Sequence, residues 1–168
     1  FTIGTAVRLF GVSAPHHPPQ ARARGAEFVR AMCGIAVAID WDGAEHIVPQ
    51  LMNGILHRGD VSDRVVSPRP RTAMGTRRLR IVDMDRAVQP VASFDGKLLV
   101  SFNGEIYNHQ ELRRELEAQG VPFRTDSDTE VLANALQVWG IKALTLLNGM
   151  FAFVALDVPT GEFLAARD

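Results

Sequence analysis

The single cysteine of the chain, Cys33, stands in the run Met32-Cys33-Gly34-Ile35, where its chemistry depends on its own nitrogen. If Met32 is the initiator, an aminopeptidase can remove it because the next residue is small. Cys33 would then carry a free α-amine, which titrates near about 7.7–8.0, beside a thiol that titrates near about 8.5. One residue would thus supply both nucleophile and base. Taken alone, however, a lone cysteine is more often a small buried apolar residue.

Three further clusters have side chains suited to binding an amide substrate. Asn103-Gly104 could donate hydrogen bonds to a developing oxyanion from the Asn103 amide and the Gly104 N–H, although an Asn-Gly step is usually only a turn. Asp128 lies in Ser127-Asp128-Thr129-Glu130, where helix capping explains Ser127 and Glu130 but leaves the Asp128 carboxylate for a substrate ammonium. Arg78, in Arg77-Arg78-Leu79, could grip a carboxylate with two hydrogen bonds, although charged residues are usually solvated.

Apolar patterns in the first half of the chain predict the elements that must hold Cys33 and Arg78. Residues 33–39 form a short apolar run bounded by a turn signal, which predicts a buried strand. Residues 45–57 have apolar side chains at helical spacing. The polar, proline-broken segment 65–71 predicts a loop, and 72–82 predicts a strand pair around Gly75.

Turn and cap signals organise the second half. Asp95-Gly96 predicts a hairpin between 91–92 and 98–100, and we expect the strand 98–102 to end at Asn103-Gly104. Asn108 is expected to cap a helix that Gly120 ends. A second helix, ending at Gly140, is expected to begin in a capping box, in which Ser127 bonds the Glu130 amide and Glu130 bonds back. Residues 150–158 and 161–166 predict two more strands, so we expect a layered α/β or α+β domain with a largely antiparallel sheet.

The composition is that of a soluble globular domain. The chain has 168 residues, of which 46% are hydrophobic and 22% charged. Its net charge of −1 gives no reason to expect a nucleic acid or a membrane as partner, and no apolar run approaches the roughly 18 residues of a membrane span. One cysteine excludes an intrachain disulfide and a multi-cysteine metal site, so we expect no metal and a cytoplasmic location.

The first 31 residues differ from the rest. They carry four arginines and three prolines against one acid, Glu27, and show no sustained apolar period. Three interpretations remain open: translation from upstream of a true start at Met32, a cleaved propeptide, or an organelle-targeting segment. We therefore expect residues 1–32 to be an extension and residues 33–168 to be the domain.

The order and spacing of the clusters resemble the class II glutamine amidotransferases, and within them the N-terminal glutaminase domain of asparagine synthetases. The matching segments are MCGIA at 32–36, LHRGD at 56–60, RRLRIVD at 77–83, QP at 89–90, SFNGEIYNHQELRREL at 101–116, FRTDSDTEVL at 123–132, WG at 139–140, GMFAFVALD at 149–157 and ARD at 166–168. The resemblance implies an α+β fold, the four-layer αββα N-terminal-nucleophile hydrolase fold with mostly antiparallel sheets.

The resemblance also implies roles for individual residues. Cys33 matches the nucleophile, Asn103 and Gly104 match the oxyanion hole, and Arg78 matches the group that holds the glutamine α-carboxylate. The groups near the α-amine are matched by Glu105 and Asp128, and the glutamine-binding segment also takes in Leu79 and Ile81. The expected partners are L-glutamine and a C-terminal synthetase domain, which uses ATP and Mg²⁺ to activate aspartate for the ammonia; the glutaminase domain itself needs no cofactor. A homodimer is among the open assembly states.

Two departures from the family pattern stand out. The family usually has a proline before the residue that matches Asp60, and a histidine where this chain has Thr76. Neither lies on a residue with an assigned role, so we expect glutamine binding to survive both. The rival interpretations are a catalytically silent regulatory or interaction domain of the same fold, and an amidotransferase with another acceptor or another amide substrate.

Overall fold

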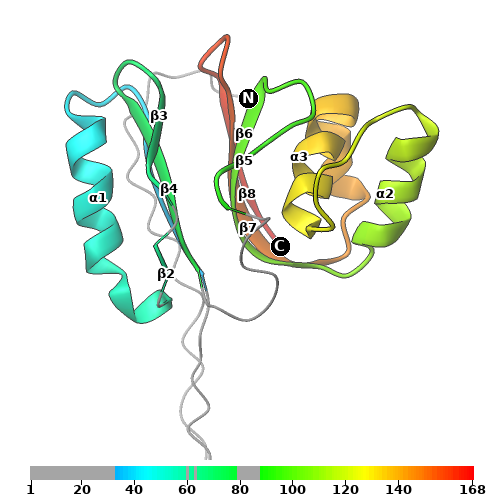
Figure 1. Ribbon diagram of the computed structural model, residues 1–168, viewed down its shortest axis with the longest axis horizontal. Coiled ribbons are helices and arrows are strands. Elements are labelled where there is room, and N and C mark those ends of the chain that lie inside the picture. The colour runs from blue at the N-terminus through cyan, green and yellow to red at the C-terminus, as the bar shows by residue number, and fades with distance from the viewer. Residues whose placement is uncertain (1–32, 60, 63, 79–87) are drawn as a thin grey trace, which may run out of the picture.

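The structure, a computed structural model, describes residues 33–59, 61–62, 64–78 and 88–168. Among these residues, the strands form two sheets that lie face to face, with α1 on one outer side and α2 and α3 on the other (Figure 1). The elements in chain order are β1 Gly34–Ala38, α1 Ala44–Gly54, η1 Leu56–Arg58, β2 Val61–Ser62, β3 Val66–Arg69, β4 Thr72–Arg78, β5 Val91–Ala92, β6 Leu98–Ile106, α2 His109–Ala118, α3 Asp128–Trp139, η2 Gly140–Thr145, β7 Gly149–Asp157 and β8 Phe163–Arg167. This layering confirms the expected αββα fold.

The first sheet, called sheet A below, is built around β4, with which β1, β2 and β3 each pair in the antiparallel sense. Helix α1 covers its outer face through a single stripe, because Ala44, Val48 and Met52 recur every four residues and are buried. These side chains pack against the alanines of β1 and β4. The small alanine side chains let the helix lie close to the sheet.

The second sheet, sheet B, has the strand order β5-β6-β7-β8, and its pairs are antiparallel too. Val100, Phe102 and Phe153 point outward from it and join one buried cluster with the apolar faces of α2 and α3. Leu116 of α2 and Leu132 of α3 lie in that cluster and have essentially no exposed surface. Sheet B is therefore fixed on its outer face by both helices.

A third cluster fills the space between the two sheets. Ile35, Val37 and Met74 come from sheet A, and Leu99 and Val154 come from sheet B. Side chains alternate between the two faces of a strand. The odd-numbered residues of β1 and β6 and the even-numbered residues of β4 and β7 therefore point inward.

Two expectations for sheet A are wrong. The expected loop at 65–71 contains β3, because Pro68 needs no N–H partner on a strand that pairs on one side only. The expected strand pair around Gly75 is one continuous strand, β4. Gly75 lies in a narrow space inside it, because an added Cβ would lie 3.2 Å from Val65 Cγ2 and 3.4 Å from Met52 Sδ on α1.

Two expected element ends also differ. Strand β6 does not stop at Asn103-Gly104, because Gly104 stays paired with Phe151 of β7 and the strand runs on to Ile106. The first helix ends at Gly54, and the next residues form the short 3₁₀ turn η1. The hairpin at Asp95-Gly96 and the strands on either side of the turn at 158–161 are confirmed.

The helix caps are confirmed in position but only partly in their bonds. Ser127 Oγ accepts a hydrogen bond of 3.2 Å from the Glu130 amide, as expected. The carboxylate of Glu130 does not bond back to Ser127; it accepts instead from the amides of Arg124 and Thr125, because burial makes it take the donors of the preceding loop. Asn108 precedes α2 without a side-chain cap bond.

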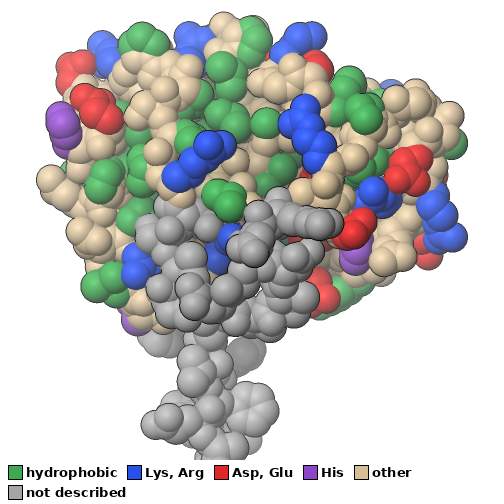
Figure 2. All heavy atoms as spheres, in the orientation of Figure 1, with side chains coloured by type: hydrophobic (Ala, Val, Ile, Leu, Met, Phe, Trp, Pro, Cys, Tyr) green, Lys and Arg blue, Asp and Glu red, His purple; other side chains and the backbone are tan. Residues whose placement is uncertain are grey.

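None of the helices in the described part of the chain has the length and hydropathy of a membrane span. Figure 2 shows basic and acidic side chains interspersed on the face in view, in keeping with the net charge of −1. The described part of this face therefore presents no field of a single sign.

Candidate active site

Cys33 and Arg78 belong to one end of sheet A. Strands β1 and β4 pair with Gly34 opposite Arg77, so the same register continued by one residue places Cys33 opposite Arg78. Ile35 points into the core between the sheets. The two-residue period of a strand therefore directs Cys33 and Arg78 to the inner face. Cys33 is half-buried, and its thiol forms no disulfide.

Asn103 and Glu105 lie near the end of β6 in sheet B. Leu99 packs between the sheets, whereas Phe102 packs against the helices. The same alternation therefore places Asn103 and Glu105 on the inner face of sheet B, toward sheet A. Asn103 is buried and Glu105 is exposed. The Asn103 amide thus faces the sheet from which Cys33 comes.

The two pairs of residues lie at the same end of the sandwich. At the opposite end, Arg69 Nη1 donates to the carbonyl oxygens of Val158 at 2.7 Å and Pro159 at 2.6 Å, which joins the β3–β4 turn to the β7–β8 turn. In Figure 1 these two turns are at the top, and the C-terminus is at the other end of sheet B. Arg78 is six residues along β4 from Thr72, and Asn103 is five along β6 from Leu98. At about 3.3 Å per residue, both are about 17–20 Å from the braced end.

Gly104 occupies a backbone position that excludes other residues. Its φ is +148°, and an added Cβ would lie 2.1 Å from the carbonyl oxygen of Met150 on β7. Gly149 meets β6 equally closely, because its added Cβ would lie 2.1 Å from the Glu105 oxygen. The Asn103-Gly104 step is thus no turn; it is the point where two strands approach each other without side chains between them.

The hydrogen-bond pattern of β6 shows which edge the Gly104 N–H faces. Lys97 O accepts from the Val158 amide, and Tyr107 N donates to Asn148 O at 2.7 Å. Odd-numbered residues of β6 therefore exchange hydrogen bonds with β7. The N–H groups of even-numbered residues, Gly104 included, point to the opposite edge, where β5 has already ended.

Two side chains take the neighbouring N–H groups on that open edge. Gln89 Oε1 accepts from the Phe102 amide at 2.7 Å, and Asp128 Oδ2 accepts from the Ile106 amide at 3.1 Å. The N–H of Gly104 lies between these two along the strand. A ligand oxygen can therefore approach it from this edge, which no strand of the described residues covers.

Asp128 is the first residue of α3 and is half-buried beside the end of β6. Burial raises the pKa of its carboxyl above the ordinary value, while the hydrogen bond from Ile106 and the nearby His109 oppose that rise. His109 Nδ1 itself lies 2.9 Å from the Ile106 carbonyl oxygen. Burial disfavours the ionised form of this carboxyl, so a bound cation beside it would stabilise that ionised form.

Arg58 and Gly59, to which the sequence pattern assigned no role, brace the Cys33 end of sheet A. Arg58 Nη2 donates to the carbonyl oxygen of Cys33 at 3.4 Å. Gly59 lies so close to β4 that an added Cβ would be 2.3 Å from Arg78 O, and its own oxygen accepts from Arg77 Nε at 2.8 Å. The LHRGD match at 56–60 was the signal that could have pointed to them.

The remaining residues of the pattern fall elsewhere. Leu79, Ile81 and Asp60 lie outside the described residues, as does the segment 1–32. Thr76, on the inner face two residues before Arg78, is buried, and its hydroxyl has no partner within the described part of the chain.

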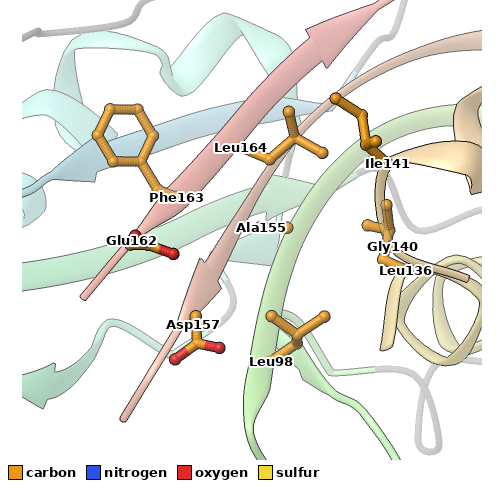
Figure 3. A pocket seen from close by; sticks show the side chains of 9 residues that line it. All are labelled: Leu98, Leu136, Gly140, Ile141, Ala155, Asp157, Glu162, Phe163 and Leu164. Atoms are coloured by element: carbon orange, nitrogen blue, oxygen red, sulfur yellow. The ribbon is translucent and has the colours of Figure 1, made fainter. Parts of the chain in front are cut away.

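A separate cavity of about 260 Å³ opens between β8 and the α3–η2 junction (Figure 3). Its lining includes Leu98 and Asp157, which belong to the end of sheet B that Arg69 braces, and none of the residues expected to act on glutamine. The site is therefore not this cavity.

Comparison with known proteins shows the family to which the chain belongs. The model of the glutamine amidotransferase domain family matches residues 32–168. An asparagine synthetase [glutamine-hydrolyzing] 1 of Bacillus subtilis is 41% identical over 124 residues, which are 74% of this chain and 20% of the relative, and one of Arabidopsis thaliana is 35% identical over 141 residues, 82% and 24%. The chain thus spans about a fifth to a quarter of the length of these relatives.

Solved structures with the same fold include the glutamine phosphoribosylpyrophosphate amidotransferase of B. subtilis in complex with ADP and GMP. It matches with a TM-score of 0.64 and 24% identity, over 82% of this chain and 37% of that one. An allosteric regulatory enzyme of purine biosynthesis matches with a TM-score of 0.68 and 23% identity, over the same shares. At these identities the likeness concerns the fold. The family match over residues 32–168 places the chain in the glutamine amidotransferase domain family.

Proposed function

We propose that this domain hydrolyses the side-chain amide of glutamine, with Cys33 as the nucleophile. The proposal is carried by one observation: sheet A brings Cys33 and Arg78, and sheet B brings Asn103 and Gly104, to the same end of the sandwich. A nucleophile and a pair of oxyanion donors on facing layers are what acyl transfer needs. Membership of the glutamine amidotransferase family supports glutamine as the substrate.

The proposed reaction proceeds in two halves. Cys33 Sγ attacks the side-chain carbonyl carbon of glutamine while the Cys33 α-amine takes the thiol proton. The Asn103 amide and the Gly104 N–H stabilise the tetrahedral oxyanion, and loss of one such donor costs about 2.7–4 kcal/mol of barrier. The α-ammonium returns the proton to the leaving nitrogen, ammonia departs and a thioester remains. Water then attacks the thioester, and the α-amine relays its proton to Sγ as glutamate leaves.

Three charged residues are proposed to bind the α-carboxylate and the α-amine of the substrate glutamine. Arg78 holds the α-carboxylate, for which a guanidinium supplies two parallel donors. Glu105 and Asp128 hold the α-amine, and the half-buried carboxylate of Asp128, whose pKa is raised by burial, gains its ionised form when that cation is bound. Leu79 and Ile81 are proposed to complete this segment of the pocket.

The nitrogen of Cys33 decides whether the site works. As long as residue 32 is attached, that nitrogen belongs to an amide and has no lone pair available for a proton. We therefore propose that the active form begins at Cys33. Arg58 contacts the carbonyl oxygen of the same residue, so the backbone of Cys33 is held from its other side.

For the longer protein, we propose that the ammonia serves ATP- and Mg²⁺-dependent formation of asparagine from aspartate in a C-terminal synthetase domain, in the cytoplasm. The similarity to glutamine-hydrolysing asparagine synthetases supports this assignment. The domain described here would need no cofactor of its own.

The test compares three chains in a glutamate-release assay: one with residues 1–168, one that starts at Met32 and is processed to Cys33, and the processed chain with Cys33→Ala. N-terminal sequencing establishes which chains begin at Cys33. We expect hydrolysis only from the processed chain with its cysteine. Equal hydrolysis by the 1–168 chain that retains its first 32 residues would overturn the role of the α-amine. No hydrolysis by the processed chain, together with no labelling of Cys33 by a glutamine-analogue electrophile, would favour a catalytically silent domain.

A further inference from the structure

Strand β5 is very short, and side chains extend its pairing with β6 at both ends. The paired residues are Val91 with Val100 and Ala92 with Leu99. Beyond one end, Ser93 Oγ accepts a hydrogen bond of 3.0 Å from the Leu98 amide. Beyond the other end, Gln89 Oε1 accepts one of 2.7 Å from the Phe102 amide. Both bonds fall on β6 positions two residues from Val100, where an antiparallel partner would supply a backbone carbonyl.

The two bonds differ in what lies next to them. The Ser93 bond is at the hairpin of Asp95 and Gly96, at the end of sheet B that Arg69 braces. The Gln89 bond holds the residue immediately before Asn103. Gln89 and Phe102 are both buried, so water cannot replace the bond readily.

The Gln89 bond also ends the hydrogen-bonded pairing of β5 with β6 just before Gly104. A backbone strand continued past Phe102 would pair with Gly104 next and cover its N–H. A side-chain acceptor satisfies Phe102 and stops there, so that among the described residues no strand pairs with Gly104 at this edge. On the far side of Gly104, Asp128 Oδ2 holds the Ile106 amide in the same way.

We infer that Gln89 is a positioning residue for the oxyanion hole. By holding the Phe102 amide, it fixes the direction of β6 through Asn103 and Gly104 while keeping the edge beside Gly104 accessible to the substrate oxygen. The expected effect on catalysis rests on the proposed function. The expected effect on the β6 backbone rests only on the geometry of β5 and β6. Gln89 stands in the QP pair of the sequence pattern, to which no role was assigned.

The experiment compares Gln89→Met, which removes the acceptor at similar length, with Ser93→Ala, which removes the matched bond at the other end of β5. Each variant is assayed for glutamine hydrolysis in the form that begins at Cys33. We expect Gln89→Met to lower kcat by about tenfold or more with KM changed less than twofold, because the loss falls on the transition state. Ser93→Ala should lower the melting temperature while leaving kcat within twofold.

Amide hydrogen exchange of the 1–168 chain gives a readout that needs no activity. We expect Gln89→Met to speed exchange at Phe102 and Asn103 by at least tenfold over the wild type, and Ser93→Ala to speed it only near Leu98. Gln89→Glu retains an acceptor oxygen and should restore most of the protection. Equal exchange rates at Asn103 in the Gln89→Met and Ser93→Ala chains, or equal kcat losses, would overturn the inference. If the wild-type chain hydrolyses no glutamine, the proposed function fails, and the exchange rates alone decide the role of Gln89.

Discussion

The carboxylate of Asp128 accepts a 3.1 Å hydrogen bond from the amide of Ile106, so the first residue of α3 is tied to the last residue of β6. Burial raises the pKa of that carboxyl in the folded chain. Between the ordinary aspartate value of about 3.9 and the raised folded value, the folded chain therefore holds more protons than the unfolded one. Its stability should fall as pH rises through this window. Thermal unfolding from pH 3.5 to 7 should show that slope in the wild type and a flatter curve in Asp128→Asn.

Asp128→Asn also distinguishes an effect on folding stability from an effect on glutamine binding. An asparagine oxygen can still accept from Ile106, so Asp128→Asn should be at least as stable as the wild type at pH 7. Its KM for glutamine should rise by about thirtyfold or more, since removal of one partner of a buried charge pair costs about 2 kcal/mol or more. An unchanged KM would contradict the contact of Asp128 with the α-amine.

Gly104→Ala should both lower the stability of the domain and abolish glutamine hydrolysis. The substitution adds a methyl group 2.1 Å from Met150 O at a φ of +148°, and we expect a loss of about 2 kcal/mol or more in the free energy of unfolding. Gly96→Ala is the matched control, because Gly96 has a φ of +75° but open space around it, and it should cost about 1 kcal/mol. Urea unfolding measures both. If the two variants lose equal stability, the approach of β7 to Gly104 is looser than described.

The sequence indicated which residues gather at this end of the sandwich better than it indicated their backbone. Asn103-Gly104 carries the local signal of a turn, yet β6 runs through it, because Gly104 stays paired with Phe151 of β7 and Gly149, opposite Ile106, lets the two strands stay equally close there. That coincidence joins positions 45 residues apart, and local propensity does not contain it. Gly75 shows the same limit, since the side chains of Val65 and of Met52 on α1, ten and more residues away, surround it.

The supporting residues were hidden for a related reason. Gln89 and Arg58 act through backbone groups of Phe102 and Cys33, and a bond from a side chain to a distant backbone leaves no periodic pattern in sequence. The Ser127 cap was predictable because its partner is three residues away. The return bond of the capping box was not predictable, since the Glu130 carboxylate accepts hydrogen bonds from the amides of Arg124 and Thr125 instead of from Ser127.

Thr76→Val should stabilise the domain. The Thr76 hydroxyl is buried on the inner face of β4 without a partner in the described residues, and valine has nearly the same shape without the polar atom. Removing a buried, unpaired hydroxyl should raise the free energy of unfolding by about 1 kcal/mol. Chemical denaturation measures the change. A loss of stability instead would indicate that the hydroxyl holds an internal water molecule.

Arg69→Met should weaken the sandwich without touching glutamine. It removes the two bonds to Val158 O and Pro159 O while keeping most of the apolar stem, and we expect a loss of about 1–3 kcal/mol. KM should stay within twofold because these bonds lie at the end opposite Asn103. Arg71→Met is the control at an exposed site: Arg71 pairs with Asp42 and donates to Asp40 O at 2.9 Å at the surface, and its loss should cost about 1 kcal/mol or less.

Neighbouring arginines on β4 should respond to the same change in opposite ways. Arg77 Nε donates to Gly59 O at 2.8 Å, a bond that lysine cannot make from the same place, so Arg77→Lys should lower stability by about 1 kcal/mol with little effect on KM. Arg78 points to the inner face beside Cys33, and Arg78→Lys should raise KM for glutamine by about tenfold or more, because lysine grips a carboxylate with one donor instead of two. Steady-state kinetics and thermal unfolding of both variants give a two-by-two comparison. A higher KM in Arg77→Lys than in Arg78→Lys would mean that β4 presents the other arginine to the substrate, and would move the carboxylate contact to the outer face of sheet A.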